Sequence, residues 1–189
     1  FWPVLEPVTP LIGGWPLDAV CRHLEAVTFG DITRLLINVP PGFMKSLLTN
    51  VFWPAWEWGP MDKPHLRYLS FSYSSSLTER DNERFRDLIR SEPYQTLWGK
   101  GFELVKDGAV KITNDKTGWK LASSVGGVGT GERGDRVLLD DLHNVKDILS
   151  EVVMPETNRW LRESVMNRLN NMDTSVIVSI GQRVHEDDS

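Results

Sequence analysis

The segment from Arg34 to Leu48 constrains the fold more than any other part of the chain. Residues 34–39 form an apolar run rich in branched side chains, which indicates a buried strand. A Pro-Pro-Gly turn follows at residues 40–42, and Lys45-Ser46 then opens a run that can be helical. A strand, a tight loop and a helix start together can bind a phosphate group, because loop N–H groups and the helix N-terminus face the anion.

Lys45 and Ser46 supply the chemistry of this expected phosphate site. Lys45 adds a full positive charge, and the Ser46 hydroxyl can join the coordination of a magnesium ion. The loop departs from the regular motif G-x-x-x-x-G-K-[ST], because Val39 replaces the first glycine and Met44 the second. The candidate phosphate-binding residues are contiguous: Pro41, Gly42, Phe43, Met44, Lys45, Ser46 and Leu47.

Strand and helix patterns alternate along the rest of the chain. Strands are expected at 34–39, 66–71, 136–139 and 174–180, and helices at 16–27, 45–53, 76–89 and 155–169. This alternation predicts an α/β fold with a mainly parallel central sheet covered by helices on both faces. Three further short strands, at 102–105, 110–112 and 119–122, predict a small antiparallel insert. Residues 1–14, broken by Pro and Gly, are expected to form an extended lead-in.

Some details of these helices also follow from the sequence. Pro54 is expected to end or kink the helix that starts at Lys45. Residues 76–79 have the Ser-x-x-Glu form of a capping box. The arginines of the helix that follows alternate with carboxylates, which favours a solvated face of ion pairs at i,i+3 and i,i+4 over phosphate contact.

Polar residues follow three of the expected strands. Ligands of parallel sheets bind beyond the carboxyl ends of the strands, where Lys45, Asp140-Asp141 and Gln182 are expected to meet in one crevice. The magnesium ion of a nucleoside triphosphate needs protein ligands, a role for which Asp140 and Ser46 are suited. Hydrolysis also needs a general base or an orienting group for the attacking water, a role for which Asp141 is suited. Gln182 could sense the γ-phosphate. For Asp140-Asp141 in isolation, a helix cap or a solvated strand end is the alternative.

A glycine-rich loop at residues 125–135 precedes the Asp-Asp strand and carries Arg133. A guanidinium on the γ-phosphate is worth about 10³–10⁵ in rate where it has been measured. Arg133 is the candidate for this role, on its own nucleotide or on that of a neighbouring subunit, and Arg136 is the competitor. A structural salt bridge remains the alternative for either arginine.

Composition narrows the class of protein. The net charge of −5 argues against a surface that is basic all over, so any contact with nucleic acid is expected to be local. No apolar run approaches the roughly 20 residues of a membrane span. A single cysteine, Cys21, excludes an internal disulfide and fits a reducing compartment.

With these motifs in order, the chain resembles the N-terminal ATPase domain of the large terminase subunit of tailed bacteriophages. The resemblance rests on residues 36–46, 129–143 and 180–188 and covers nearly the whole length. It implies a P-loop NTPase of the ASCE type, a single ATPase domain over residues 1–189, and ATP and Mg²⁺ as substrate and cofactor. It assigns Lys45 and Ser46 to Walker A, Asp140 and Asp141 to Walker B, Gln182 to the coupling motif and Arg133 to the arginine finger.

The resemblance also implies partners and a place in the cell. In that family the domain drives translocation of double-stranded viral DNA into the procapsid. It works as a homo-oligomeric ring, usually of five subunits, on the portal protein and together with the small terminase subunit. This activity takes place in the host cytoplasm and involves no membrane. Residues 184–189 are expected to begin a linker to a C-terminal nuclease domain that this chain lacks, so ATP hydrolysis without DNA cleavage is expected.

Two rival interpretations remain open at this point. The same site chemistry serves helicases and other P-loop translocases, which often carry further motifs in a second domain. A nucleotide-binding module without turnover is the other alternative, favoured by the irregular glycine pattern and by Asp141, where Glu is more common. Many terminases have Arg where Gly42 stands and Gly where Met44 stands. No motif near residues 1–16 identifies an adenine pocket.

Overall fold

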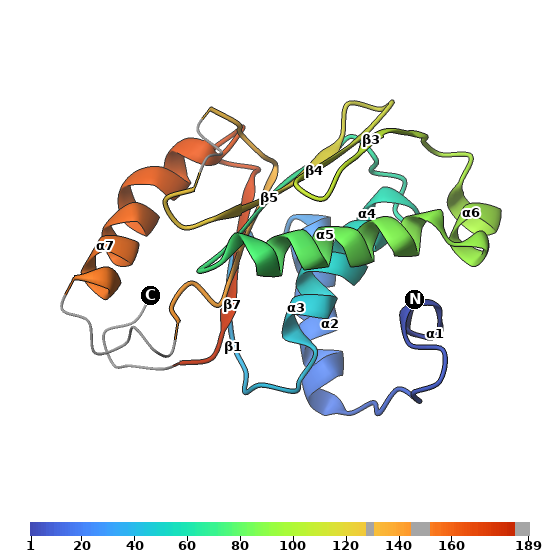
Figure 1. Cartoon of the computed structure of the whole chain (residues 1–189), viewed down its shortest axis with the longest axis horizontal. Coiled ribbons are helices and arrows are strands. Elements are labelled where there is room, and N and C mark those ends of the chain that lie inside the picture. Colours follow the sequence, from blue (N-terminus) through green and yellow to red (C-terminus); the bar gives the residue numbers. More distant parts are fainter. Residues whose placement is uncertain (128–130, 145–151, 184–189) are drawn as a thin grey trace.

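A seven-stranded mixed sheet with helices on both faces forms the centre of the molecule (Figure 1). The computed structural model describes residues 1–127, 131–144 and 152–183. The strand order is β1 (Arg34–Asn38), β7 (Val176–Gly181), β6 (Arg136–Asp140), β2 (Arg67–Ser72), β5 (Trp119–Ser124), β4 (Lys111–Asn114) and β3 (Leu104–Asp107). The first five strands are parallel and the last two antiparallel. The predicted α/β fold with a mainly parallel sheet is confirmed.

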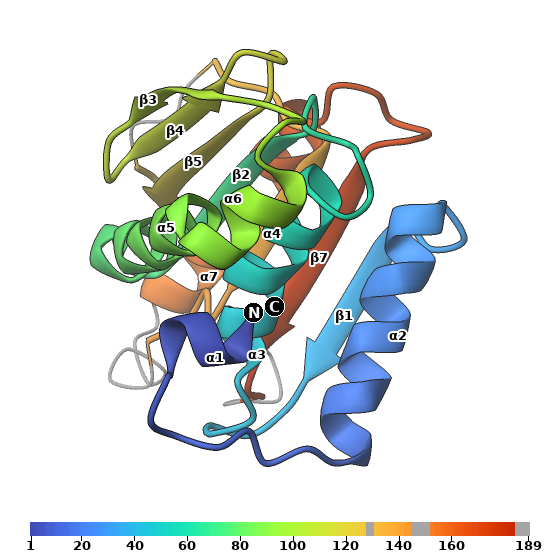
Figure 2. The same cartoon turned by 90° about the vertical axis from the view of Figure 1, so that its right-hand side faces the viewer.

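Helices cover the two faces of this sheet unequally, as Figures 1 and 2 show. One face carries α2 (Trp15–Phe29), α3 (Lys45–Leu47), η1 (Leu48–Phe52), α4 (Trp53–Trp58), α5 (Ser75–Arg90) and α6 (Glu92–Trp98). The other face carries α7 (Val153–Trp160), which continues as η3 (Leu161–Val165) and η4 (Met166–Arg168). Leu138 packs in the core of the first face and its neighbours Val137 and Leu139 in the core of the second. Because side chains alternate along a strand, a strand covered on both faces is apolar throughout.

The predicted antiparallel insert is only partly correct. β5 pairs in parallel with β2 and therefore belongs to the main sheet. Only β4 and β3 run antiparallel, and they extend the sheet beyond β5. The first five residues of β5 are buried, which is typical of a strand inside a sheet and not of a separate hairpin.

The helix that starts at Lys45 does not end at Pro54 but continues to Trp58. Pro54 lies in the first turn of α4, directly after the π-helical turn η1. A regular α-helix would need the N–H that proline lacks at this position, and the helix changes its hydrogen-bond register just before it. Trp53 and Trp58 are buried in the core.

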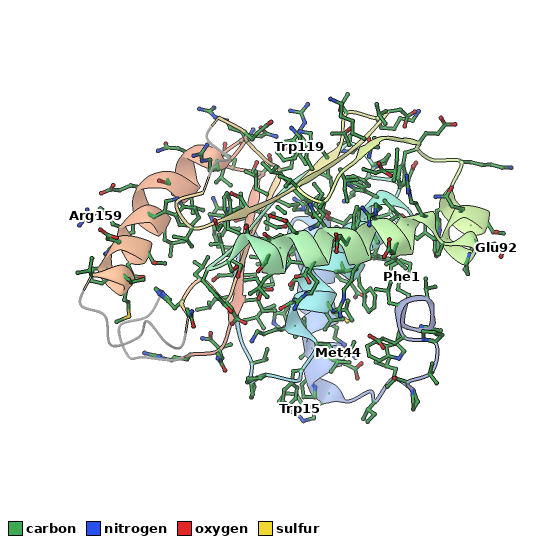
Figure 3. The ribbon with its side chains drawn as sticks, in the orientation of Figure 1. Phe1, Trp15, Met44, Glu92, Trp119 and Arg159 are labelled. Atoms are coloured by element: carbon green, nitrogen blue, oxygen red, sulfur yellow. The ribbon has the colours of Figure 1, made fainter. Side chains whose placement is uncertain are left out.

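Two local predictions near the helices are wrong, and one short helix was missed. Residues 1–14 are not all extended, because α1 (Trp2–Leu5) forms and the Phe1 ring packs 5.8 Å from the rings of Phe52 and Trp98 (Figure 3). The capping box at 76–79 is not used, since α5 begins at Ser75 with Ser74 as N-cap. The short helix α6, capped by Ser91, was not predicted.

The arginines of α5 form ion pairs, but not at the predicted spacing. Arg80 pairs with Asp81 at 3.0 Å, next to it in the chain. Arg90 instead pairs with Asp107, at the end of β3. The helix at 155–169 begins two residues earlier than predicted, at Val153. Residues 128–130 of the glycine-rich loop and the expected linker at 184–189 lie outside the described residues. None of the described helices is long and apolar enough to cross a membrane.

Candidate functional site

The carboxyl ends of β1, β7 and β6 meet at one edge of the sheet, at the bottom of Figure 1. Lys45 begins α3 directly after the loop that leaves β1, and its Nζ lies 3.0 Å from Asp141 Oδ2. Lys45 is buried, whereas 29% of the Asp141 side chain is exposed. Two charged residues that are almost a hundred positions apart in sequence therefore form one ion pair at the predicted crevice.

The loop between β1 and α3 turns through two left-handed residues. Gly42 has φ +89° and Met44 has φ +55°, and the Leu48 N–H then donates to the Met44 carbonyl at 2.9 Å to start the helix. Figure 3 shows Met44 at this edge of the molecule. The first N–H groups of a helix have no partner inside the helix. Those of Lys45, Ser46 and Leu47 thus lie where an anion could bind.

Asp140, the last residue of β6, is buried beside this helix. Asn50 Nδ2 donates to Asp140 Oδ2 at 3.0 Å, while Asp140 Oδ1 is buried with no hydrogen-bond partner in the described structure. Burial raises the pKa of Asp140 to about 7; hydrogen bonding from Ser46 lowers it, the Asp141 charge raises it and Lys45 lowers it. A cation bound beside Asp140 would favour the ionised form of its carboxyl group.

Asp141 is held by the neighbouring strand β7. Its backbone is left-handed, with φ +42°, which Asp tolerates better than most residues. Its N–H donates to the Ile180 carbonyl at 3.0 Å, and its carboxylate Oδ1 accepts from the Gln182 N–H at 3.2 Å. A Cβ at Gly181 would lie 3.3 Å from the same Oδ1, so the small residue leaves room for the carboxylate.

Gln182 joins the site through its backbone. Its side chain is half-buried and lines a small cavity that also includes Asn38 and His143. The predicted convergence of Lys45, the Asp-Asp pair and Gln182 is therefore present in the structure, with β7 between the strand of the phosphate loop and the strand of the carboxylates.

The donor set fits a magnesium ion with few protein ligands. No group of three or more His, Cys, Asp or Glu side chains in the described part of the chain could hold a metal. Magnesium in nucleotide sites usually binds one or two protein groups and completes its shell with phosphate oxygens and water. Ser46 and the unpartnered Asp140 Oδ1 are the residues that would hold it.

The structure does not bring Arg133 or Arg136 to this crevice. Arg136 begins β6, and its buried guanidinium donates to both carboxylate oxygens of Glu57, at 2.8 and 3.1 Å. Burial lowers the pKa of Arg136, but the hydrogen bonds that it donates to Glu57 and the charge of that carboxylate outweigh this effect and raise it. Arg133 is exposed and lies before the same end of β6. The length of β6, roughly 15 Å at the usual rise per residue, separates that end from Asp140.

Sequence reasoning missed two features of the site. The first is Asn50, whose spacing of four residues from Ser46 could have placed it on the same helix face. The second is a cavity of about 480 Å³ beside Met44 and Leu48, between the N-terminal segment and α2. Apolar and aromatic side chains dominate its lining, with Asp18 and Glu25 as carboxylates.

Comparisons with known proteins add no identification to this geometry. The scan against protein-family models and the search of curated proteins both found no match to the chain.

Proposed function

We propose that the chain is a magnesium-dependent ATPase domain with a P-loop fold of the ASCE type. The observation that carries the proposal is the ion pair between Lys45 Nζ and Asp141 Oδ2, 3.0 Å apart, beside Asp140 and Ser46. A lysine at the start of a helix after a tight loop is suited to phosphate oxygens, and adjacent carboxylates are suited to a metal ion and to water. A solvated strand end would not bury Asp140 against this helix.

Lys45 and Asp141 have complementary roles in the proposed reaction. Without nucleotide, the Lys45 ammonium neutralises the Asp141 carboxylate. The β- and γ-phosphate oxygens of ATP compete for the ammonium, which releases Asp141 to accept a proton from the attacking water. The water oxygen bonds to the γ-phosphorus while the bond from that phosphorus to the β,γ-bridging oxygen breaks, so that ADP leaves. Magnesium held by Ser46 and Asp140 would neutralise charge on the phosphate oxygens. An Asp side chain is shorter than Glu, so this water has to lie close to β6.

Gln182 provides the proposed link from the site to the rest of the molecule. Its N–H donates to the same carboxylate that pairs with Lys45. When Asp141 breaks its ion pair with Lys45 and binds the attacking water, a movement of its carboxylate would shift Gln182, the residue after β7, through this hydrogen bond. The third motif of the resemblance thus has a physical connection to the phosphate site.

The cavity beside Met44 is suited to the nucleoside. Its volume of about 480 Å³ lies within the roughly 300–1,000 Å³ usual for ligand pockets. Met44 and Leu48, which line it, flank Lys45 and Ser46 in the sequence. Aromatic walls favour a planar base, and the carboxylates of Asp18 and Glu25 could accept hydrogen bonds from an amino group.

We further propose that this ATPase is the motor domain of a phage large terminase, on the strength of the three motifs in order. It would drive double-stranded viral DNA into the procapsid as a pentameric ring, with the portal protein and the small terminase subunit as partners in the host cytoplasm. In such a ring Arg133, which is exposed at the far end of β6, would act on a neighbour's nucleotide. Arg136 is excluded from this role by its buried pairing with Glu57.

Steady-state ATP hydrolysis, compared without DNA, with duplex DNA and with single-stranded DNA of equal length, tests this function. The terminase assignment predicts magnesium-dependent turnover that duplex DNA stimulates most, and no cleavage of the DNA. Lys45→Ala, prepared in the same way, provides the background rate. Preferential stimulation by single strands would favour a helicase. Tight ATP binding with turnover no faster than that of Lys45→Ala, even with DNA and portal present, would indicate a binding module.

A further inference from the structure

Asn50 is a buried amide next to the candidate metal ligand, and none of the sequence motifs includes it. It lies in the π-helical turn η1, and 1% of its surface is exposed. Its Nδ2 donates to Asp140 Oδ2 at 3.0 Å, across from the end of β6. Ser46, four residues earlier on the same helix, interacts with the same carboxyl group. Residues four apart lie on one helix face, so Ser46 and Asn50, on two successive turns of this helix, both interact with Asp140.

Two oxygen atoms of this pair have no hydrogen-bond partner among the described residues. They are Asn50 Oδ1 and Asp140 Oδ1, both buried. An unsatisfied buried acceptor costs about 1–3 kcal/mol, so native structures rarely keep one without a reason. The Asn50 amide nitrogen faces Asp140 Oδ2 and donates to it. The carbonyl of Asn50 is consequently left without a donor.

This arrangement directs one oxygen of Asp140 to the protein and leaves the other unused. Asn50 Nδ2 donates to Oδ2, Ser46 interacts with the carboxyl group, and Oδ1 has no hydrogen-bond partner among the described residues. Residues that bind a metal are oriented by their other hydrogen-bonding partners. A carboxylate that binds magnesium through one oxygen is therefore oriented by the group that donates to its second oxygen. A π-helical turn inside an α-helix is itself a feature that recurs at functional sites.

We propose that Asn50 is a positioning residue of the nucleotide site, which holds Asp140 so that Oδ1 faces the magnesium ion of bound MgATP. The inference rests on the proposed ATPase function and adds a residue to it. Asn50 does not touch the nucleotide in this account. It acts through Asp140, and its loss lowers the contribution of magnesium to ATP binding while the affinity for metal-free ATP stays the same.

The test is the ratio of ATP affinities measured with excess magnesium and in EDTA. Asn50→Leu keeps the size of the side chain and removes the donor, so this ratio should fall by about 10–100-fold, as it does when partners of metal ligands are lost in other proteins. Asn50→Ser covers the case in which leucine does not fit at this position. Its side chain is too short to reach Asp140, so the ratio should also fall in this variant. The EDTA affinity should match wild type in both.

Thr49→Val is the matched control. Thr49 is the neighbouring residue, is equally buried, and donates from Oγ1 to the Lys45 carbonyl of its own helix at 2.9 Å. It should keep the wild-type ratio even if its thermal stability changes, which separates a loss of packing from a loss of positioning.

The outcomes separate the positioning role of Asn50 from the proposed ATPase function. A wild-type ratio in both Asn50 variants would overturn the role of Asn50 and leave the proposed ATPase intact. An equal fall in Thr49→Val would also overturn it, because general disturbance of η1 would then explain the effect. Wild-type protein that binds ATP no better with magnesium than in EDTA would overturn both the inference and the proposed function.

Discussion

At the scale of single residues, position 44 shows how the phosphate loop tolerates an unusual sequence. Met44 has φ +55°, a left-handed backbone that costs a residue with a side chain roughly 1–2 kcal/mol relative to glycine. Glycine, common at this position in the family that the chain resembles, has no such cost. The loop therefore places a side chain at a left-handed position that favours glycine, and Met44 carries the resulting strain.

This strain leads to a prediction for substitutions at position 44. Met44→Gly should bind ATP at least as well as wild type, because glycine adopts the left-handed backbone freely. Met44→Val should weaken binding by about tenfold or more, since a β-branched side chain disfavours this conformation further. Titration with a fluorescent ATP analogue measures both. Equal affinity of the valine variant and wild type would show that the left-handed turn is not needed for binding.

At the scale of elements, β5 and α5 are joined by a buried lysine. Lys120 on β5 is fully buried, and its Nζ donates to Asn82 Oδ1 of α5 at 2.6 Å. Burial lowers the pKa of Lys120 to about 8, although the charge of Asp81 opposes the shift. In the unfolded chain the pKa returns to its ordinary value near 10.5. Between these values the unfolded state binds more protons than the folded state.

Stability should therefore rise with pH in this window. Below pH 8 Lys120 is charged in both states, so its contribution is constant. From pH 8 to 10.5 the free energy of unfolding should gain up to about 3 kcal/mol from this residue. Urea denaturation across this range, with Lys120→Met as the comparison, isolates the effect, because other groups titrate alike in both proteins. Parallel pH profiles for the two proteins would contradict the buried-charge account.

The elements also show what the sequence could and could not predict. β6 and β7 were predictable because each is an apolar run that ends in polar residues. The parallel pairing of β5 with β2 was not, because short strands separated by turns suit a hairpin equally well. α1 depends on tertiary packing around Phe1, which no local pattern encodes. The start of α6 does have a local signal, since Ser91 is its N-cap and Glu92 and Pro93 lie in its first turn. The contact between Asn50 and Asp140 depends on the register of η1 against the sheet.

At the scale of the whole molecule, the carboxyl and amino ends of the sheet strands carry different groups of polar residues. The carboxyl edge gathers Lys45, the two carboxylates and Gln182. The amino edge is closed by a buried group in which Arg136 donates to Glu57, and the Tyr68 hydroxyl donates to the same carboxylate. Removing either partner would leave the other charge buried and unpaired, which costs about 3–5 kcal/mol. The sequence could not separate Arg133 from Arg136, since both precede one strand.

ATP affinity in Lys45→Ala and Asp141→Ala shows directly whether the crevice binds nucleotide. Both residues lie in one proposed site, paired with each other until ATP arrives. It predicts that Lys45→Ala loses ATP binding. Asp141→Ala should bind ATP at least as tightly as wild type, because Lys45 is then free for the phosphates, while turnover falls by about 10²–10⁴-fold. Wild-type affinity in both variants would contradict the account, because the crevice would then not be a nucleotide site.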